Sequence, residues 1–367
     1  MKILFFVAGG RAGSDFFHSL IDGHTQILQF PGYLRVDKKF GAMLNLNNPN
    51  QISDQFIKLY PEFFNSRINK FERHDKLGRK KNRYFKVSKK KFSKCFIRIM
   101  KKKNKFSKLE IIKNLHFAYS YSKNEKLNNK KILFIHTHLI EWTRLFIKIV
   151  EPKNFQILHI IRHPLASINS PLKTWLRFED GNGFFPKDLY FQLDLVFNGI
   201  SDLIKLGKVY ILKLEGLHLE NNKVMKDFCR TFKIRYENCL KESTKNGLKW
   251  WGDAASQKWL NGINKNFEIN INKKFFYERD LIFFQKLSEK IIEKYKYDFF
   301  YPRLNIYFNL LSMRCEILVW KNTIKHFFKS FRWKHFLSIP IFYLIRIILF
   351  NKLVLSKNIK YPSNLIG

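Results

Sequence analysis

Residues 1–20 read MKILFFVAGGRAGSDFFHSL, and the prediction of the fold starts from this segment. Lys2–Ala8 is a short, continuous apolar run that ends at glycines, which is typical of a buried parallel strand. From Ser14 onward the apolar residues recur at helical spacing, and we expect Ser14 or Asp15 to cap that helix. The sequence therefore predicts a strand, a glycine turn and a helix at the start of the chain.

The same order of elements recurs three times further along the chain. Apolar runs at 131–139 (KILFIHTHL), 155–164 (FQILHIIRHP) and 208–217 (KVYILKLEGL) each predict a strand followed by a helical stretch. Pro164 suits the first turn of a helix, and the last helical stretch is expected to end near Phe232. Alternating strands and helices predict an α/β fold of three layers, with a mainly parallel central sheet covered by helices on both faces.

Two segments differ in composition from the predicted α/β core. Residues 76–108 are dense in Lys and Arg with interspersed Phe and Ile, which indicates a basic insertion, partly helical and outside the sheet. After Pro302 the chain becomes basic and strongly apolar. We therefore expect one domain over 1–302, with the insertion, and a helical C-terminal extension over 303–367.

The extension contains one very apolar stretch, at 336–350, with Pro340 and Arg346 inside it. Its length is about fifteen residues, whereas a membrane-spanning helix needs roughly 20. An amphipathic helix at a membrane surface fits better than a span. A helix packed on the catalytic domain fits equally well, and the sequence leaves both interpretations open.

The net charge of the chain is extreme, +39 from 68 Lys+Arg against 29 Asp+Glu. It indicates an anionic partner such as nucleic acid, anionic lipid, an acidic polymer or a phosphorylated ligand. Codon usage in an AT-rich genome offers a plainer explanation, since Lys, Asn, Ile and Phe are abundant together. The four cysteines show no paired spacing, and the first apolar run is too short for a signal peptide, so reduced thiols and a cytoplasmic location are expected.

The glycine turn after the first strand has the features of an anion site. A turn that opens a helix presents backbone N–H groups and the positive end of the helix dipole, and here Arg11 and Ser14 add further donors. The spacing is not that of a nucleotide triphosphatase, because no lysine follows Gly13, and the glycines at 9, 10 and 13 do not fit the dinucleotide pattern. A second site is needed before a function can be named.

The stretch IIRHPLASINS at 160–170 supplies that second site. Arg162 stands at the carboxyl end of a predicted strand, and Ser170 follows eight residues later on the next helix, where it can face the same ligand. The two turns together resemble the sulfotransferase family, which has a [KR]-S-G-[TS]-[TS] loop and an R-x-P-(x)5-S segment. The matching residues here are R-A-G-S-D from Arg11 and R-H-P to Ser170.

The resemblance implies a sulfotransferase with a P-loop-like α/β fold, 3′-phosphoadenosine 5′-phosphosulfate (PAPS) as the donor and no metal. By its match to a K-T-H-L stretch, His138 is the catalytic base, and Arg11 neutralises the leaving phosphate. Read from the residues alone, His138 also fits a structural histidine at a strand end. The donor-binding residues implied are Gly10, Arg11, Ala12, Gly13, Ser14, Asp15, Phe16, Arg162 and Ser170. Asp15 departs from the family pattern, which has a hydroxyl residue there.

The acceptor implied is a hydroxyl group, on a glycan, a glycolipid or another molecule near a membrane. We expect peripheral contact of the C-terminal extension with an anionic membrane, at its inner face, and no binding of nucleic acid. One alternative is a membrane- or nucleic-acid-binding protein that uses the α/β core as a scaffold. Another is a nucleotide kinase-like phosphotransferase, which the missing lysine opposes.

Overall fold

The computed structural model describes residues 1–8, 11–102, 105–176, 184–256, 258–302, 310–331, 333–355 and 361–367. Its main feature is a six-stranded sheet in the order β2-β3-β1-β4-β5-β8, in which every neighbouring pair is parallel. The strands are β1 (Lys2–Ala8), β2 (Ile27–Leu28), β3 (Ile132–His138), β4 (Phe155–Ile161), β5 (Val209–Lys213) and β8 (Leu365–Ile366). The predicted α/β class is confirmed.

β1 lies at the centre of the sheet and is buried on both faces. Because successive side chains of a strand point to opposite faces, Leu4 and Phe6 enter one core, whereas Phe5 and Val7 enter the other. This explains why the strand reads as a continuous apolar run.

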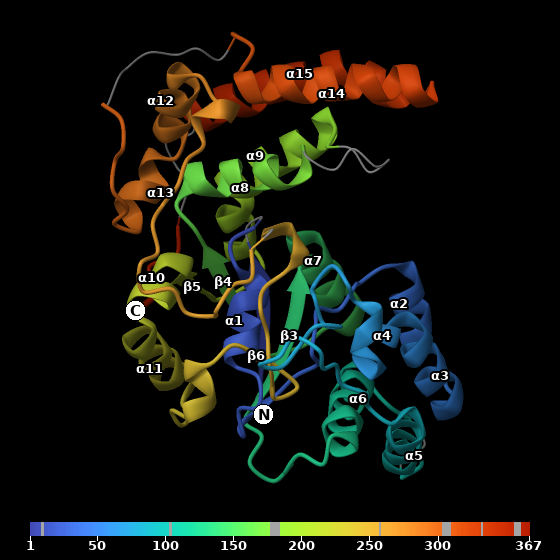
Figure 1. The fold of residues 1–367 in the computed structure, drawn as a ribbon. Helices are drawn as coiled ribbons and strands as arrows, with labels where there is room; N and C mark the ends of the chain where they lie inside the picture. Colours follow the sequence, from blue (N-terminus) through green and yellow to red (C-terminus); the bar gives the residue numbers. More distant parts are fainter. Residues whose placement is uncertain are drawn as a thin grey trace.

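Helices cover both faces of the sheet, as Figure 1 shows. One core contains side chains of α1 and α11, and the other contains side chains of α7 and α9. The helices are α1 (Ser14–Leu20), α2 (Lys38–Leu44), α3 (Pro49–Leu59), α4 (Pro61–Phe64), α5 (Lys89–Met100), α6 (Lys108–Ser122), α7 (Ile140–Val150), α8 (Pro164–Trp175), α9 (Pro186–Ile204), α10 (Leu214–Leu219), α11 (Asn221–Phe232), α12 (Glu278–Leu287), α13 (Glu289–Lys294), α14 (Arg314–Ser330) and α15 (Trp333–Leu355). A short antiparallel pair, β6 (Thr244–Lys245) and β7 (Leu248–Lys249), lies outside the main sheet.

The basic segment at 76–108 contributes α5, which packs against α3 and α6. Phe92, Phe96 and Met100 of this helix are fully buried, while its Lys residues at 89, 90 and 91 are exposed. The segment is thus part of a packed helical layer beside the sheet.

The C-terminal helices α14 and α15 pack on α9, and the chain then returns to the sheet, where β8 pairs with β5. The domain boundary at 302 stays a prediction. The length argued for the apolar stretch is wrong, because α15 runs for 23 residues and Trp333–Leu353 is by length and composition long enough to cross a membrane. The length was underestimated because the apolar stretch was counted only from 336 to 350, whereas the helix extends beyond it on both sides and contains Pro340.

Candidate functional site

The carboxyl ends of β1, β3, β4 and β5 meet at one edge of the sheet, where α8 and α9 also lie (Figure 1). The turn after β1, the histidines of β3 and the Arg162 segment after β4 are therefore neighbours in space. Ligands of open parallel sheets bind at this edge.

The turn between β1 and α1 depends on one glycine. Gly13 has φ +85° and is the residue before α1, so the expectation that Ser14 or Asp15 caps the helix is wrong. A Cβ on Gly13 would lie 2.5 Å from a methyl carbon of Leu214, which leaves room for glycine alone. Ala12 is buried. Gly9 and the predicted donor-binding Gly10 lie outside the described residues.

The fold brings together two of the predicted site residues, Ser14 and His138. Ser14 Oγ lies 3.3 Å from His138 Nδ1, although the two residues are 124 positions apart. His138 ends β3 with φ +63°, an unusual conformation for histidine that occurs preferentially at functional sites. Its ring stacks on Tyr33, with 4.9 Å between centroids.

The charges around His138 favour a neutral imidazole beside an ionised carboxylate. Burial lowers the pKa of His138, an effect that Arg11 reinforces and Asp15 opposes. Burial alone would raise the pKa of Asp15, but Lys245 and His138 outweigh it, and the pKa lies below its ordinary value. The negative charge of Asp15 thus has a cation, Lys245, within reach.

A pair of histidines, His18 and His136, lies close to Asp15. His18 donates from Nε2 to the carbonyl of Phe30 at 2.9 Å, and its Nδ1 lies 3.1 Å from Nδ1 of His136. Burial holds the pKa of both imidazoles well below the ordinary value, so a neutral His136 donates to His18. Asp15, His18 and His136 offer ligand atoms within 4.8 Å of one another, but the charge of buried Lys245 opposes a cation there.

Arg162 follows β4 directly, at the start of α8. Its Nε is enclosed and makes no hydrogen bond within the part of the chain that the structure describes. Burial lowers the pKa of its guanidinium, with Glu215 opposing and Arg11 adding to that shift. Two guanidinium groups therefore repel one another at this edge, and a bound anion would relieve both the repulsion and the unmet hydrogen bond.

Glu215 of α10 orders the segment around Arg162. One carboxylate oxygen accepts from the backbone N–H of His163 at 2.8 Å, and the other accepts from the hydroxyl of Tyr297 at 3.2 Å. The carboxylate is thus engaged with neutral donors and is buried. These hydrogen bonds fix the backbone directly after β4, where Arg162 lies.

Three aromatic rings form a stack beside Arg162. The imidazole of His218 lies between Phe16 and Phe267, at centroid distances of 4.4 and 4.6 Å and with 11° between planes in both pairs. The guanidinium carbon of Arg162 is 5.8 Å from the ring of Phe267. An aromatic stack next to an arginine offers a flat ring face to a nucleotide base and a positive charge to its phosphate.

Two further predicted site residues are Arg11 and Ser170. Arg11 forms an ion pair with Asp253 at 3.0 Å, so its charge is partly matched. Ser170 is half-buried on α8, and no hydrogen bond joins its side chain to Arg162 among the described residues.

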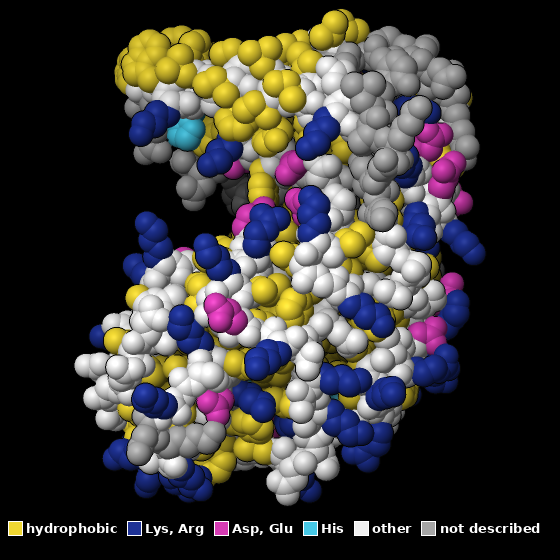
Figure 2. Space-filling view, turned by 180° about the vertical axis from the view of Figure 1, so that it is seen from behind, with side chains coloured by type: hydrophobic (Ala, Val, Ile, Leu, Met, Phe, Trp, Pro, Cys, Tyr) yellow, Lys and Arg dark blue, Asp and Glu magenta, His cyan; other side chains and the backbone are white. Residues whose placement is uncertain are grey.

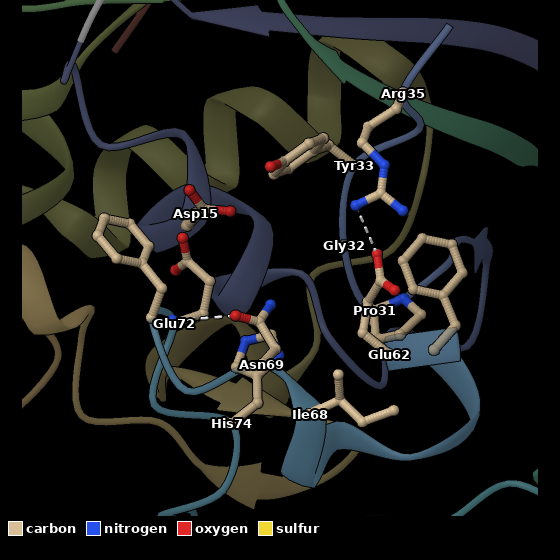
Figure 3. Close-up of a pocket in the computed structure, with 12 residues that line it drawn as sticks. Asp15, Pro31, Gly32, Tyr33, Arg35, Glu62, Ile68, Asn69, Glu72 and His74 are labelled. Atoms are coloured by element: carbon tan, nitrogen blue, oxygen red, sulfur yellow. Dashed lines mark hydrogen bonds and ion pairs between the residues drawn. The ribbon is translucent and has the colours of Figure 1, made fainter. Parts of the chain in front are cut away.

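A cavity of about 400 Å³ opens beside the turn, on the side of Asp15. Figure 3 shows the carboxyl groups of Asp15 and Glu72 next to one another at one end of it, with Tyr33 above. Arg35 closes the far wall through an ion pair with Glu62 at 3.0 Å. Figure 3 places this pair away from Asp15, so the two ends of the cavity differ in charge.

Two polar atoms on the cavity wall lack partners within the described residues, Oε2 of Glu72 and Nε2 of His74, and both are buried. Burial raises the pKa of Glu72 well above its ordinary value, and Asp15 adds to this. Burial lowers the pKa of His74 to about 3. On this wall, burial therefore disfavours the charged form of both the Glu72 carboxyl and the His74 imidazole.

Sequence reasoning missed the residues Glu72, His74, Lys245, Asp253, His218 and Phe267. None belongs to a motif that could be read locally, except that His218 follows the predicted strand at 208–217 by one position. Lys245 and Asp253 occur in a stretch rich in Gly and Trp that bears no diagnostic spacing. Their contacts to the turn after β1 span more than two hundred residues.

No family model matches the chain, and no curated protein matches it. The solved structures that match the chain include two sulfotransferase domains. The sulfotransferase domain from the curacin biosynthetic pathway is 13% identical, with a TM-score of 0.42 over 83% of this chain and 94% of that domain. The sulfotransferase domain from the Synechococcus PCC 7002 olefin synthase is 14% identical, with a TM-score of 0.42 over 82% of this chain and 96% of that domain.

Proposed function

We propose that the chain is a sulfotransferase that moves the sulfuryl group of PAPS to a hydroxyl acceptor. The observation that carries the proposal is Arg162 at the carboxyl end of β4, whose enclosed guanidinium Nε has no hydrogen-bond partner among the described residues. Charge repulsion from Arg11 and the adjacent stack of Phe16, His218 and Phe267 support an anion attached to a flat base.

In the proposed reaction the acceptor hydroxyl gives its proton to His138. The acceptor oxygen forms a bond to sulfur while the bond from sulfur to the 5′-phosphate oxygen breaks, and that oxygen keeps the electron pair. The turn amides, Ser14 and Arg11 stabilise the charge that develops on the phosphate. Ser14, at 3.3 Å from Nδ1, orients the ring so that Nε2 faces the acceptor. Arg162 binds the 3′-phosphate, and Ser170 approaches it when the donor is bound.

The cavity beside Asp15 is the proposed acceptor site. Its volume of about 400 Å³ suits a sugar unit or a molecule of similar size. An ionised Asp15 repels anionic acceptors, whereas Glu72 and His74 offer a donor and an acceptor to neutral hydroxyl groups. A neutral glycan or the headgroup of a glycolipid is therefore the class of acceptor that we propose.

Calorimetric titration with adenosine 3′,5′-bisphosphate, the product nucleotide, tests the donor site. The native chain should bind it, and Arg162→Ala should weaken binding by about 2 kcal/mol or more, because a charge-assisted hydrogen-bonded pair is lost. Arg144→Ala is the matched control, since Arg144 is a half-exposed arginine on α7 and its loss should leave the affinity unchanged.

Absence of binding by the native chain would exclude the proposal. Equal losses in Arg162→Ala and Arg144→Ala would show that net charge alone attracts the nucleotide. Tighter binding of ATP than of the bisphosphate would favour the kinase-like alternative.

A further inference from the structure

The C-terminal helices carry an apolar surface that the other described residues leave exposed. On α15, Leu337, Ile341, Leu344 and Ile348 are all more than half exposed, from 52% to 67%. Their spacing of four, three and four residues places them on one side of the helix. Figure 2 shows hydrophobic side chains gathered over this end of the molecule.

The end of α14 extends the same surface. Ile324, Phe328 and Phe331 are spaced by four and three residues, and the two phenylalanines are each 69% exposed. Trp333, at the start of α15, is 59% exposed. An exposed apolar surface of this size, rich in aromatic residues, marks an interaction site rather than ordinary surface variation.

The opposite side of α15 is held firmly to the protein. Leu349 and Phe350 are buried in a core shared with α9 and α12. Arg346 makes a buried, bidentate pair with Glu316 of α14, at 2.8 Å from Nε and 2.9 Å from a terminal nitrogen. If α15 spanned a bilayer, the two partners of this pair would be separated or would lie in lipid, and either outcome would cost free energy.

The charge of the segment identifies the partner. Glu316 is the last acidic residue of the chain, and no Asp or Glu follows it over 317–367. Lys321, Lys329 and Lys334 are exposed beside the apolar surface, which Figure 2 shows bordered by Lys and Arg side chains. A second copy of this surface would bring lysines against lysines, and nucleic acid would leave the apolar side chains in water.

We propose that this surface, defined by the seven exposed residues Ile324, Phe328, Phe331, Leu337, Ile341, Leu344 and Ile348, docks on a bilayer that contains anionic lipid. The helices lie in the plane of the interface, with the apolar side chains among the acyl chains and the lysines at the headgroups. Trp333 lies at the depth where tryptophan is enriched. This orientation turns α8, α9 and the carboxyl edge of the sheet toward the membrane (Figure 1).

Vesicle flotation of the full chain tests the proposal. The chain should float with vesicles of phosphatidylcholine mixed with phosphatidylglycerol, and much less with phosphatidylcholine alone. The triple variant Ile341→Glu, Leu344→Glu, Ile348→Glu should lose at least about tenfold in affinity, since buried apolar area is removed and negative charge is added. Leu219→Glu, at an equally exposed leucine of α10, is the control and should float like the native chain.

The contribution of charge is tested separately. Lys321→Gln, Lys329→Gln and Lys334→Gln should each reduce binding about fivefold at low salt, with additive effects. Retained binding of adenosine 3′,5′-bisphosphate shows that a variant is folded, but the flotation result does not depend on the proposed enzyme activity.

Any one of three results would overturn the proposal. The first is that the native chain floats with neither kind of vesicle. The second is that the membrane-bound chain resists extraction by alkaline carbonate, which indicates a spanning helix. The third is that the chain binds no vesicles but forms a dimer in solution, which the triple variant dissociates.

Discussion

His138 shows how a single residue acquires a property that the sequence does not state. The motif places a histidine at the end of a strand, and the fold holds it half-buried, with Ser14 at one ring nitrogen and Tyr33 stacked on the ring. Because burial lowers the pKa, the base stays neutral at pH values where an ordinary histidine is half protonated. Asp15 opposes this shift, which limits its size.

The pH dependence of sulfuryl transfer follows from this shift. The neutral form of His138 is the active one, so kcat/KM should stay level as the pH falls to about 6.5 and decline only below it. A pH–rate profile with saturating donor measures the acidic limb. His138→Ala should abolish turnover and keep the affinity for adenosine 3′,5′-bisphosphate. A limb at or above the ordinary histidine pKa would contradict the assigned role.

At the scale of elements, the strand–turn–helix unit from β1 to α1 positions the anion site. The turn relies on Gly13, whose φ of +85° and contact with Leu214 connect it to the start of α10. Glu215, the next residue of α10, orders the segment after β4 through the N–H of His163. The two predicted motifs are therefore joined by one short helix that neither motif contains.

Substitution of Gly13 tests how much the conformation of this turn and its contact with Leu214 contribute to the stability of the fold. Gly13→Ala should lower the free energy of unfolding by about 1 kcal/mol for the left-handed backbone, and by roughly 1–3 kcal/mol more because the new methyl group overlaps Leu214. Gly23→Ala is the matched control, because Gly23 has φ +76° and no atom within 4 Å of the added methyl group. Urea unfolding measures both, and equal losses would show that Leu214 moves aside freely.

At the scale of the whole molecule, the excess of positive charge and the buried histidines govern behaviour in solution. His74 and His116 are buried with pKa values lowered to about 3, and His159 to about 4, in each case by burial. These groups stay neutral in the folded chain, whereas the unfolded chain protonates them near pH 6.5.

Folding stability should therefore fall under mild acid. As the pH drops below about 6.5 the unfolded state binds more protons than the folded state, and each buried histidine removes up to about 1.4 kcal/mol per pH unit. Urea unfolding at about pH 7 and about pH 5 measures the slope. His116→Gln should make the slope shallower, and a stability that does not change over this range would show that these histidines are accessible to protons in the folded state.

Much of the fold was predictable because its signals are local. The strands β1, β3, β4 and β5, the helix after each, and the end of α11 at Phe232 were predicted from apolar runs and glycine or proline positions. β2 and β8 were not, because strands of two residues carry no periodicity. The N-cap of α1 was predicted wrongly because side-chain preference was weighed there, whereas the backbone conformation of Gly13 decides it.

The sequence by itself determined the parallel sheet and the two turns that carry Arg11 to Asp15 and Arg162, since hydrophobic period and motif spacing act over short stretches of chain. Only the tertiary structure decided what surrounds them. The charge of Lys245 lowers the pKa of Asp15, and Asp253 pairs with Arg11. The apolar face of α15 is exposed because its other face packs on α9. Contacts between residues so distant in the chain leave no local pattern, because they form through packing of the whole molecule.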